Sequence, residues 1–103
     1  MDYVMYIGLN DKDTKKQKIN TLEAYKIVSN ILLNNNIDGA TIFEAQGIYK
    51  HENGGIVIEN TLRVELAFIS DEKIIYNIIK LLKQALNQES IMLKKVKEEI
   101  SFI

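Results

Sequence analysis

Polar side chains gather on two segments, residues 39–50 and 56–69, that read as the strands of one β-hairpin. One face of this hairpin is expected to carry Glu44, Gln46, Glu59, Arg63 and Glu65, with Tyr49 nearby. Carboxylates beside a guanidinium could act as an acid–base pair, bind a polar ligand or form an interface network. Acid–base catalysis requires two carboxyl groups whose environments hold their pKa values apart, and nothing in the sequence indicates such burial. The cluster therefore favours a ligand contact or an interface over catalysis.

A second polar group, Gln88, Glu89 and Ser90, stands where a predicted helix gives way to the last strand. The group is interpreted as a helix-end loop, with a ligand contact as the alternative. His51 is the only histidine, and we place it at the hairpin turn, where few partners could converge on it. A solvated His51 is the expectation.

Other short motifs have simple structural explanations. Asp11-Lys12-Asp13 resembles the start of a hard-cation loop but lacks the later acidic ligands and the glycine of a calcium loop. A solvated loop is therefore expected there, and no metal site or cofactor is predicted. Gly54-Gly55 lies between two strands and not before a helix, so a turn accounts for it better than phosphate binding. Lys94, Lys95 and Lys97 are interpreted as exposed lysines on an edge strand, where their charges discourage pairing with another chain.

Composition excludes several classes of protein. The chain has 103 residues, 47% of them hydrophobic, and a formal net charge of -1, which is the size of one domain (residues 1–103). Absence of cysteine excludes disulfides and thiolate chemistry. Near-zero charge argues against nucleic acid or an anionic membrane as the partner. No long apolar run or signal peptide is evident, so a cytoplasmic location is expected. Seventeen isoleucines and a single arginine indicate AT-rich codons, as in a low-GC bacterium.

The elements that position these residues alternate between strand and helix patterns. Strands are expected at residues 3–9, 39–50, 56–69 and 91–96, with a short fifth strand at 100–103. One helix is expected to start after Asn20, with Glu23 in capping-box relation, and another after Ser70. The order β-α-β-β-α-β predicts an α+β ferredoxin-like domain, an antiparallel sheet with two helices on one face.

The hairpin turn sets the register of its two strands. Asn53-Gly54 favours a two-residue turn, which would place Glu52 opposite Gly55 and Glu44 opposite Arg63 as a cross-strand ion pair. The face expected under the helices then consists of Thr41, Phe43, Ala45, Tyr49, Ile58, Leu62, Val64 and Leu66. The polar step at residues 59–61 suggests a bulge. Ile42 and Ile48 interrupt the polar face, which favours a surface covered by another subunit over a solvated one.

Three motifs carry a family resemblance: residues 39–49 (GATIFEAQGIY), residues 6–9 (YIGL) and residues 88–91 (QESI). In this order they resemble a small bacterial ferredoxin-like domain family of unknown activity. More distantly, the chain is similar to PII-like proteins. That resemblance implies a trimer whose subunits bind small ligands, often nucleotides, in the clefts between them. PII proteins carry a long loop between the second and third strands, where this chain has a turn of a few residues.

Three hypotheses follow. The first is a non-catalytic homo-oligomeric module, trimer or dimer, that binds a small molecule or regulates a partner. The second is a small enzyme of the dimeric α+β barrel type, with Glu44, Gln46, Tyr49 and Arg63 as its candidate residues. The third is a mobile-element protein that binds and inhibits a host protein.

Overall fold

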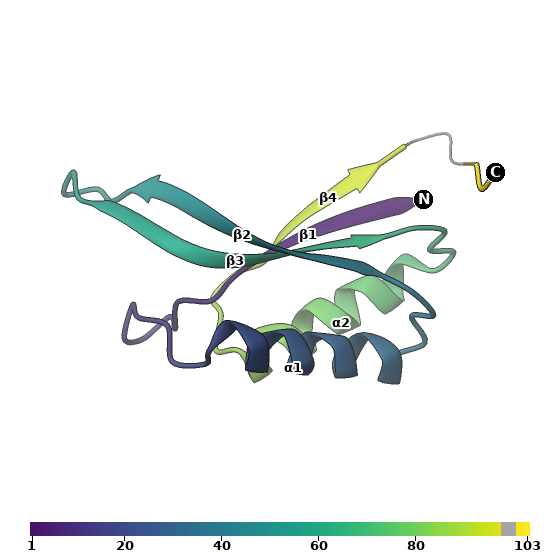
Figure 1. Ribbon diagram of the computed structural model, residues 1–103, viewed down its shortest axis with the longest axis horizontal. Helices are drawn as coiled ribbons and strands as arrows, with labels where there is room; N and C mark the ends of the chain where they lie inside the picture. The colour runs from purple at the N-terminus through teal and green to yellow at the C-terminus, as the bar shows by residue number, and fades with distance from the viewer. Residues whose placement is uncertain (98–100) are drawn as a thin grey trace.

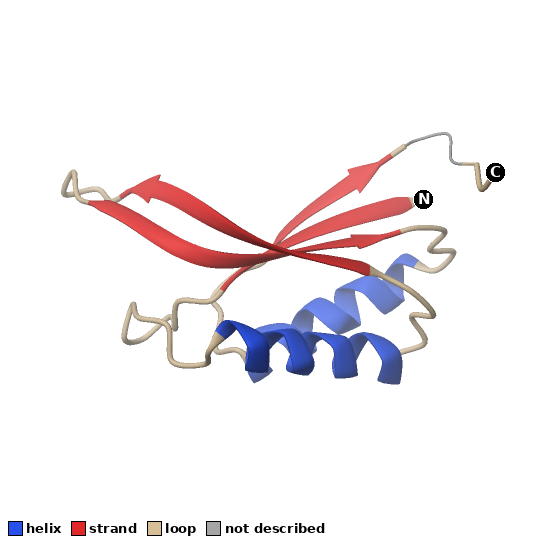
Figure 2. Ribbon diagram, viewed as in Figure 1, coloured by secondary structure: helices blue, strands red, loops and turns tan. Residues whose placement is uncertain are grey.

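The computed structural model describes residues 1–97 and 101–103 as one sheet backed by two helices. The elements are β1 (Asp2–Gly8), α1 (Thr21–Asn34), β2 (Thr41–Lys50), β3 (Ile56–Leu66), α2 (Glu72–Ala85) and β4 (Met92–Val96). The sheet is antiparallel with strand order β2-β3-β1-β4, and both helices cover the same face (Figures 1 and 2). The predicted ferredoxin-like α+β fold is confirmed. Neither helix is long and apolar enough to cross a bilayer.

The core lies between the helices and the two central strands. Apolar residues run continuously through β1, alternate with polar ones along the second half of β3 and recur at helical spacing on α1 and α2. The fully buried positions include Met5, Ile7, Val28, Leu62, Val64, Ile75, Ile78 and Leu82. The other face of the sheet, called here the open face, is covered by neither helix (Figure 2).

Helix α1 begins as predicted, because the Asn20 side chain accepts a hydrogen bond from the Glu23 N–H at 2.8 Å. The helix ends within the asparagine run 34–36, where Asn36 adopts a left-handed φ of 66°. The cap of α2 is one residue later than expected: Asp71, not Ser70, accepts from the Lys73 N–H. The expected fifth strand at 100–103 starts at a residue outside the described ones, and residues 101–103 form no strand.

The hairpin register differs from the prediction by one residue. The loop has three residues, 52–54, because His51 and not Glu52 is opposite Gly55: the His51 N–H donates to the Gly55 carbonyl at 2.8 Å. Gly54 supplies the left-handed φ of 87° that such a loop requires. Pairing then runs unbroken from Lys50–Ile56 to Thr41–Glu65, so the expected bulge is absent from this described hairpin.

A shift of one residue turns every side chain of β2 to the other side of the sheet. Phe43, not Glu44, lies opposite Arg63, and Glu44 lies opposite the buried Leu62. The predicted Glu44–Arg63 ion pair is therefore wrong. Glu44 and Gln46 are on the helix side of the sheet, and Thr41, Phe43, Ala45 and Tyr49 are on the open face. The assignment for β3 is right, with Leu62, Val64 and Leu66 under the helices.

Candidate functional site

The candidate site is the row of polar side chains that β3 presents on the open face. Glu59, Thr61, Arg63 and Glu65 alternate with the buried leucine and valine positions. Register pairs place apolar and small residues on both sides of the row: Tyr6 and Phe43 flank Arg63, and Gly8 and Ala45 flank Thr61. The predicted grouping of Glu59, Arg63 and Glu65 is thus confirmed as a shared face, although Glu44 and Gln46 do not belong to it.

Arg63 is the centre of this row. Its guanidinium carbon lies 5.7 Å from the ring centroids of both Tyr6 and Phe43. One terminal nitrogen, Nη2, is 3.2 Å from Oε2 of Glu65, and both side chains are 40% exposed. Cation–π contacts on two sides favour this position of the guanidinium, because each ring face attracts the positive charge. Among the described residues, Glu65 is the acidic partner of this guanidinium.

The Nε atom of Arg63 lies in a different environment from Nη2. It is buried and has no hydrogen-bond partner among the described residues. A buried donor without a partner costs about 1–3 kcal/mol, so native structures rarely keep one without a reason. Because atoms of this chain enclose Nε, the unpaired donor is an internal feature of the Arg63 packing.

A hollow of about 980 Å³ adjoins Arg63 at the end of the sheet where β1 begins and β4 ends, and its lining reaches from the open face to Ile37 and Leu66 on the helix side. Its lining includes Asp2, Thr41, Arg63, Glu65, Phe68 and Lys94. Pockets for small organic molecules span roughly 300–1,000 Å³, so the space suits a ligand of nucleotide size or smaller. Charges of both signs line it, which favours a ligand that has polar groups as well as an apolar body.

Glu59 has a structural task at the other end of the row. One oxygen of its carboxylate, Oε2, accepts the Asn10 N–H at 2.8 Å, while Gln88 donates to the Asn10 carbonyl at 2.8 Å. The peptide groups of Asn10 are therefore fixed from two sides, where β1 passes into the loop before α1. Gly8 makes this possible, because a Cβ at that position would overlap the Glu59 carboxylate.

Replacing Gly8 with alanine is expected to destabilise the protein by about 1–2 kcal/mol, because Glu59 must leave Asn10 and its hydrogen bond is lost. Chemical denaturation measures the effect. Gly39→Ala is the matched control, since nothing lies within 4 Å of the Cβ it would add. In a Glu59→Ala background the Gly8→Ala change should cost almost nothing; an undiminished cost there would contradict the explanation.

The other predicted site residues are scattered. Tyr49 lies toward the hairpin tip, where its ring meets the exposed His51 edge-on at 5.5 Å. Gln88 is 8% exposed and acts as an internal clamp. Glu89 and Ser90 are exposed in the turn between α2 and β4. The structure therefore brings together Arg63 and Glu65, with Glu59 further along the same strand, and separates them from the remaining candidates.

Two polar networks were not expected from the sequence. In the first, Asp11 is only 8% exposed, contrary to the predicted solvated loop. Its Oδ2 accepts the N–H groups of Asp13 and Thr14 at 3.0 Å, and its Oδ1 accepts from the Asn87 side chain at 2.7 Å. The bond from Asn87 is the main cause that lowers the pKa of Asp11 to about 2. No group of three His, Cys, Asp or Glu suited to a metal occurs among the described residues.

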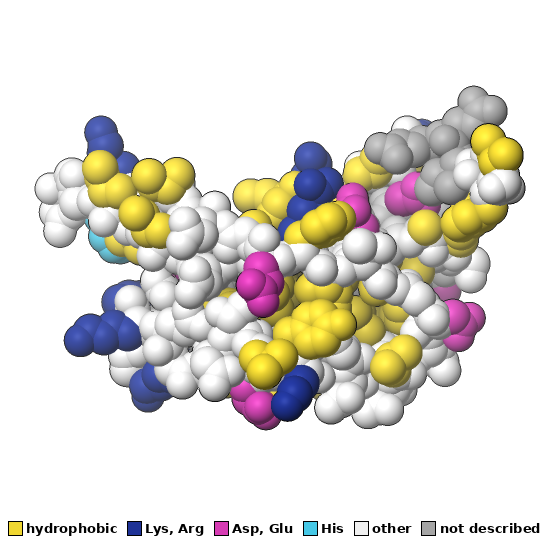
Figure 3. Space-filling view, viewed as in Figure 1, with side chains coloured by type: hydrophobic (Ala, Val, Ile, Leu, Met, Phe, Trp, Pro, Cys, Tyr) yellow, Lys and Arg dark blue, Asp and Glu magenta, His cyan; other side chains and the backbone are white. Residues whose placement is uncertain are grey.

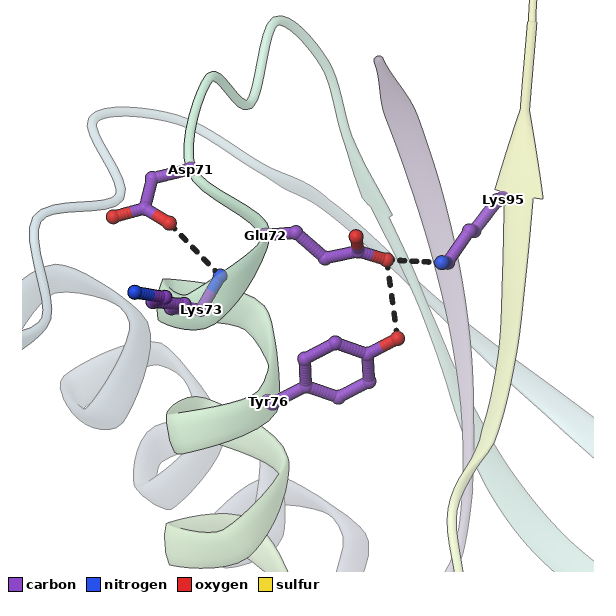
Figure 4. A network of polar contacts seen from close by, with 5 residues as sticks. All are labelled: Asp71, Glu72, Lys73, Tyr76 and Lys95. Carbon is purple, nitrogen blue, oxygen red and sulfur yellow. Dashed lines mark hydrogen bonds and ion pairs between the residues drawn. The ribbon is translucent and has the colours of Figure 1, made fainter.

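The second network joins α2 to the edge strand β4 (Figure 4). Glu72 pairs with Lys95 and also accepts the Tyr76 hydroxyl at 3.1 Å. The bond from Lys95 is the main cause of the lowered pKa of Glu72, and Glu72 in turn raises the pKa of Lys95. Burial raises the pKa of the Tyr3 phenol, which is 3% exposed on the strand beside Lys95. This arrangement fastens the edge strand β4 to α2.

Solved structures share this fold at low sequence identity. The periplasmic divalent cation tolerance protein CutA from Archaeoglobus fulgidus aligns with a TM-score of 0.65 at 14% identity, over 97% of this chain and 88% of its own. A point mutant of CutA1 from Pyrococcus horikoshii OT3 gives 0.61 at 18%, over 95% and 86%. A phage SAM lyase in complex with S-methyl-5'-thioadenosine gives 0.63 at 21%, over 89% and 76%. These likenesses establish the fold and not the activity.

Sequence comparison gives the family. No curated protein matches the chain. One family model matches residues 2–102, nearly the whole sequence, and its description is a protein of unknown function. The matched region includes all three motifs noted above, in Tyr6–Leu9, on β2 and before β4. This chain belongs to the DUF3574 family.

Proposed function

We propose that the protein is a non-catalytic, homo-oligomeric module that binds a small ligand on the open face of its sheet. The observation that carries the proposal is Arg63: a guanidinium held between two aromatic rings, half exposed, beside a hollow of about 980 Å³. A charged group with restricted motion loses little entropy when a ligand binds, which is the basis of preorganised recognition.

The surroundings of Arg63 support a covered face over a solvated one. Phe43 is 45% exposed and Met92 is 62% exposed on the open face, where no helix reaches them. Apolar side chains next to an arginine are typical of the centre of an interface. A second subunit over this face would enclose the hollow. The resemblance to PII-like proteins, which bind ligands between subunits, agrees with this arrangement.

The four candidate residues of the enzyme hypothesis do not share one face of the sheet. Glu44 and Gln46 lie on the helix side of the sheet, and Arg63 and Tyr49 lie on the open face. Side chains on opposite faces of one sheet cannot converge on a substrate within the same subunit. The fold shared with a phage SAM lyase nevertheless makes S-adenosylmethionine and S-methyl-5'-thioadenosine reasonable members of a ligand panel.

Native mass spectrometry of the protein, purified without denaturation, tests both parts of the proposal. We expect an oligomer of the 11.8 kDa chain that retains a small molecule. Thermal-shift titration with adenine nucleotides, S-adenosylmethionine and dicarboxylates identifies the class when no mass is retained. A monomer that is stabilised by none of these would contradict the proposal and favour a host protein as the partner.

Arg63→Met is expected to weaken ligand binding at least tenfold, because it removes the charge and the donors while keeping a long apolar side chain. Calorimetric titration of the ligand found above measures the change. Lys73→Met, a similar loss of charge on the exposed side of α2, is the control and should bind as the wild type does. Equal affinity of both variants would exclude Arg63 as the ligand anchor.

A further inference from the structure

The outer edge of β2 is a long strand edge that the structure leaves unpaired. Strand β2 has ten residues, stands last in the sheet order and contains no proline or bulge. The described residues offer no element that pairs with it. Natural proteins seldom leave such an edge bare, because its free N–H and C=O groups invite another strand.

An apolar ladder stands at the far end of the same hairpin. Ile48, Ile56 and Ile58 share the helix side of the hairpin and are 71%, 66% and 62% exposed. The hairpin projects past both helices and gives the molecule its length of 46 Å against 26 and 24 Å (Figure 1). Hydrophobic side chains gather on this projection at the upper left of Figure 3. A two-stranded hairpin has little stability alone, so this ladder needs a surface to pack on.

A surface of that kind lies at the opposite end of β2, on the same side of the sheet. A groove of about 280 Å³ runs between α1 and the start of β2, lined by Tyr25, Leu32, Leu33, Ile37 and Ile42. Leu33 is 64% exposed and Tyr25 is 43% exposed. Ladder and groove are thus at the two ends of one strand and cannot meet within a subunit.

We propose that a second copy of this chain pairs with the free edge, β2 against β2 in antiparallel orientation, about a two-fold axis at Ala45. This pairing joins subunits edge to edge and leaves the open face uncovered, so it is a second contact of the proposed homo-oligomer, and it rests on that proposed function only for the self-association of the chain. An antiparallel pair brings the ladder end of each strand to the groove end of the other. Because the contact is symmetric, both ladders are covered at once.

Register follows from the side chains. The helices of both copies lie on the same side of the joined sheet only if even-numbered residues face even-numbered ones and odd-numbered residues face odd-numbered ones. Centring on Ala45 sets Ile42 opposite Ile48, Glu44 opposite Gln46 and Phe43 opposite Gly47. If the two-fold axis were at Glu44, each Glu44 would lie opposite the Glu44 of the other copy. If it were at Gln46, Ile48 would lie opposite Glu44. Of these three registers, only the Ala45-centred one pairs isoleucine with isoleucine and opposes no like charges.

Backbone hydrogen bonding agrees with this register. The His51 N–H donates to the Gly55 carbonyl, and hydrogen-bonded pairs alternate with non-bonded pairs along two antiparallel strands. The odd-numbered residues of β2 therefore form their backbone hydrogen bonds with β3. Even-numbered residues 42–50 therefore direct their N–H and C=O groups to the free edge. In the Ala45-centred register these residues meet one another, and the odd-numbered pairs are of the close, non-hydrogen-bonded kind.

Single cysteines test the register, because the chain has none of its own. Ala45→Cys lies opposite itself across the axis, where close pairing suits a disulfide, so oxidation should link most of the protein into dimers. Thr41→Cys lies opposite Tyr49, far from its own copy, and should stay unlinked. Equal linking of both variants, or of neither, would overturn the proposed register.

Gln46→Pro tests the edge itself. Proline removes an N–H that faces the free edge and leaves the bonds to β3 in place, so the variant should fold and run as a lighter species in light scattering, with Gln46→Ala unchanged. An assembly that survives Gln46→Pro and leaves Ala45→Cys unlinked would overturn this interface while the homo-oligomer stands. A monomeric wild type would overturn both proposals.

Discussion

Leu62→Ala is expected to destabilise the protein by about 2–5 kcal/mol and to lower its Tm by at least about 10 °C. Leu62 is fully buried on β3, between Ile7 of β1 and the two helices. Truncation removes transfer free energy and leaves a cavity that the rigid sheet cannot close. A domain of this size has about 5–15 kcal/mol of stability in total, so the loss is a large share. Thermal and chemical unfolding measure it.

Leu22→Ala is the matched control for this substitution. The same atoms are removed, but Leu22 is 63% exposed on α1, and alanine is the better helix former. The expected change is within about 0.5 kcal/mol. Similar losses for Leu22 and Leu62 would show that the core does not lie between the sheet and the helices as described.

Asp11→Asn is expected to remove a stabilisation that depends on pH. The folded state holds the pKa of Asp11 at about 2, below its ordinary value of 3.8, mainly through the bond from Asn87. Because the folded pKa is the lower one, the unfolded state binds the proton first as the pH falls. The stabilisation is therefore complete above the unfolded pKa, at pH 5 and higher. It decreases as the pH falls from about 4 to about 2 and is absent below that.

Melting curves between pH 2 and pH 7 measure this dependence. At pH 7 the Asp11→Asn variant should melt several degrees below the wild type, since an amide cannot accept from both Asn87 and the loop N–H groups. The gap should narrow toward pH 2. Asp38→Asn, at an exposed carboxylate, serves as the control. A gap that is constant from pH 7 to pH 2 would mean that ionisation of Asp11 contributes nothing.

Asp11 also changes how the loop before α1 is understood. Its carboxylate satisfies backbone N–H groups of its own loop and ties that loop to the end of α2 through Asn87. Glu59 and Gln88 hold the neighbouring Asn10 in the same region. Residues that looked like cation ligands or catalytic acids therefore position the backbone, which leaves the open face around Arg63 as the better candidate for binding.

The sequence by itself determined the order of elements, the ferredoxin-like fold, the cap of α1 at Asn20 and the two faces of β3. These features depend on local patterns: period-two and period-3.6 burial, side-chain caps and turn residues. Glu59, Arg63 and Glu65 were placed together correctly because they alternate along a single strand.

Only the tertiary structure decided which side of the sheet β2 turns toward the helices. Asn53-Gly54 fits both a two-residue turn and the three-residue loop that is present, and the two differ by one residue of register. Because side chains alternate with a period of two, this one-residue difference in register places Phe43 opposite Arg63. Glu44 and Gln46 then lie on the other face of the sheet from Arg63. The Asp11–Asn87 bond spans 76 positions of the chain. No local pattern specifies such a contact, which forms only when the loop before α1 and the end of α2 pack together.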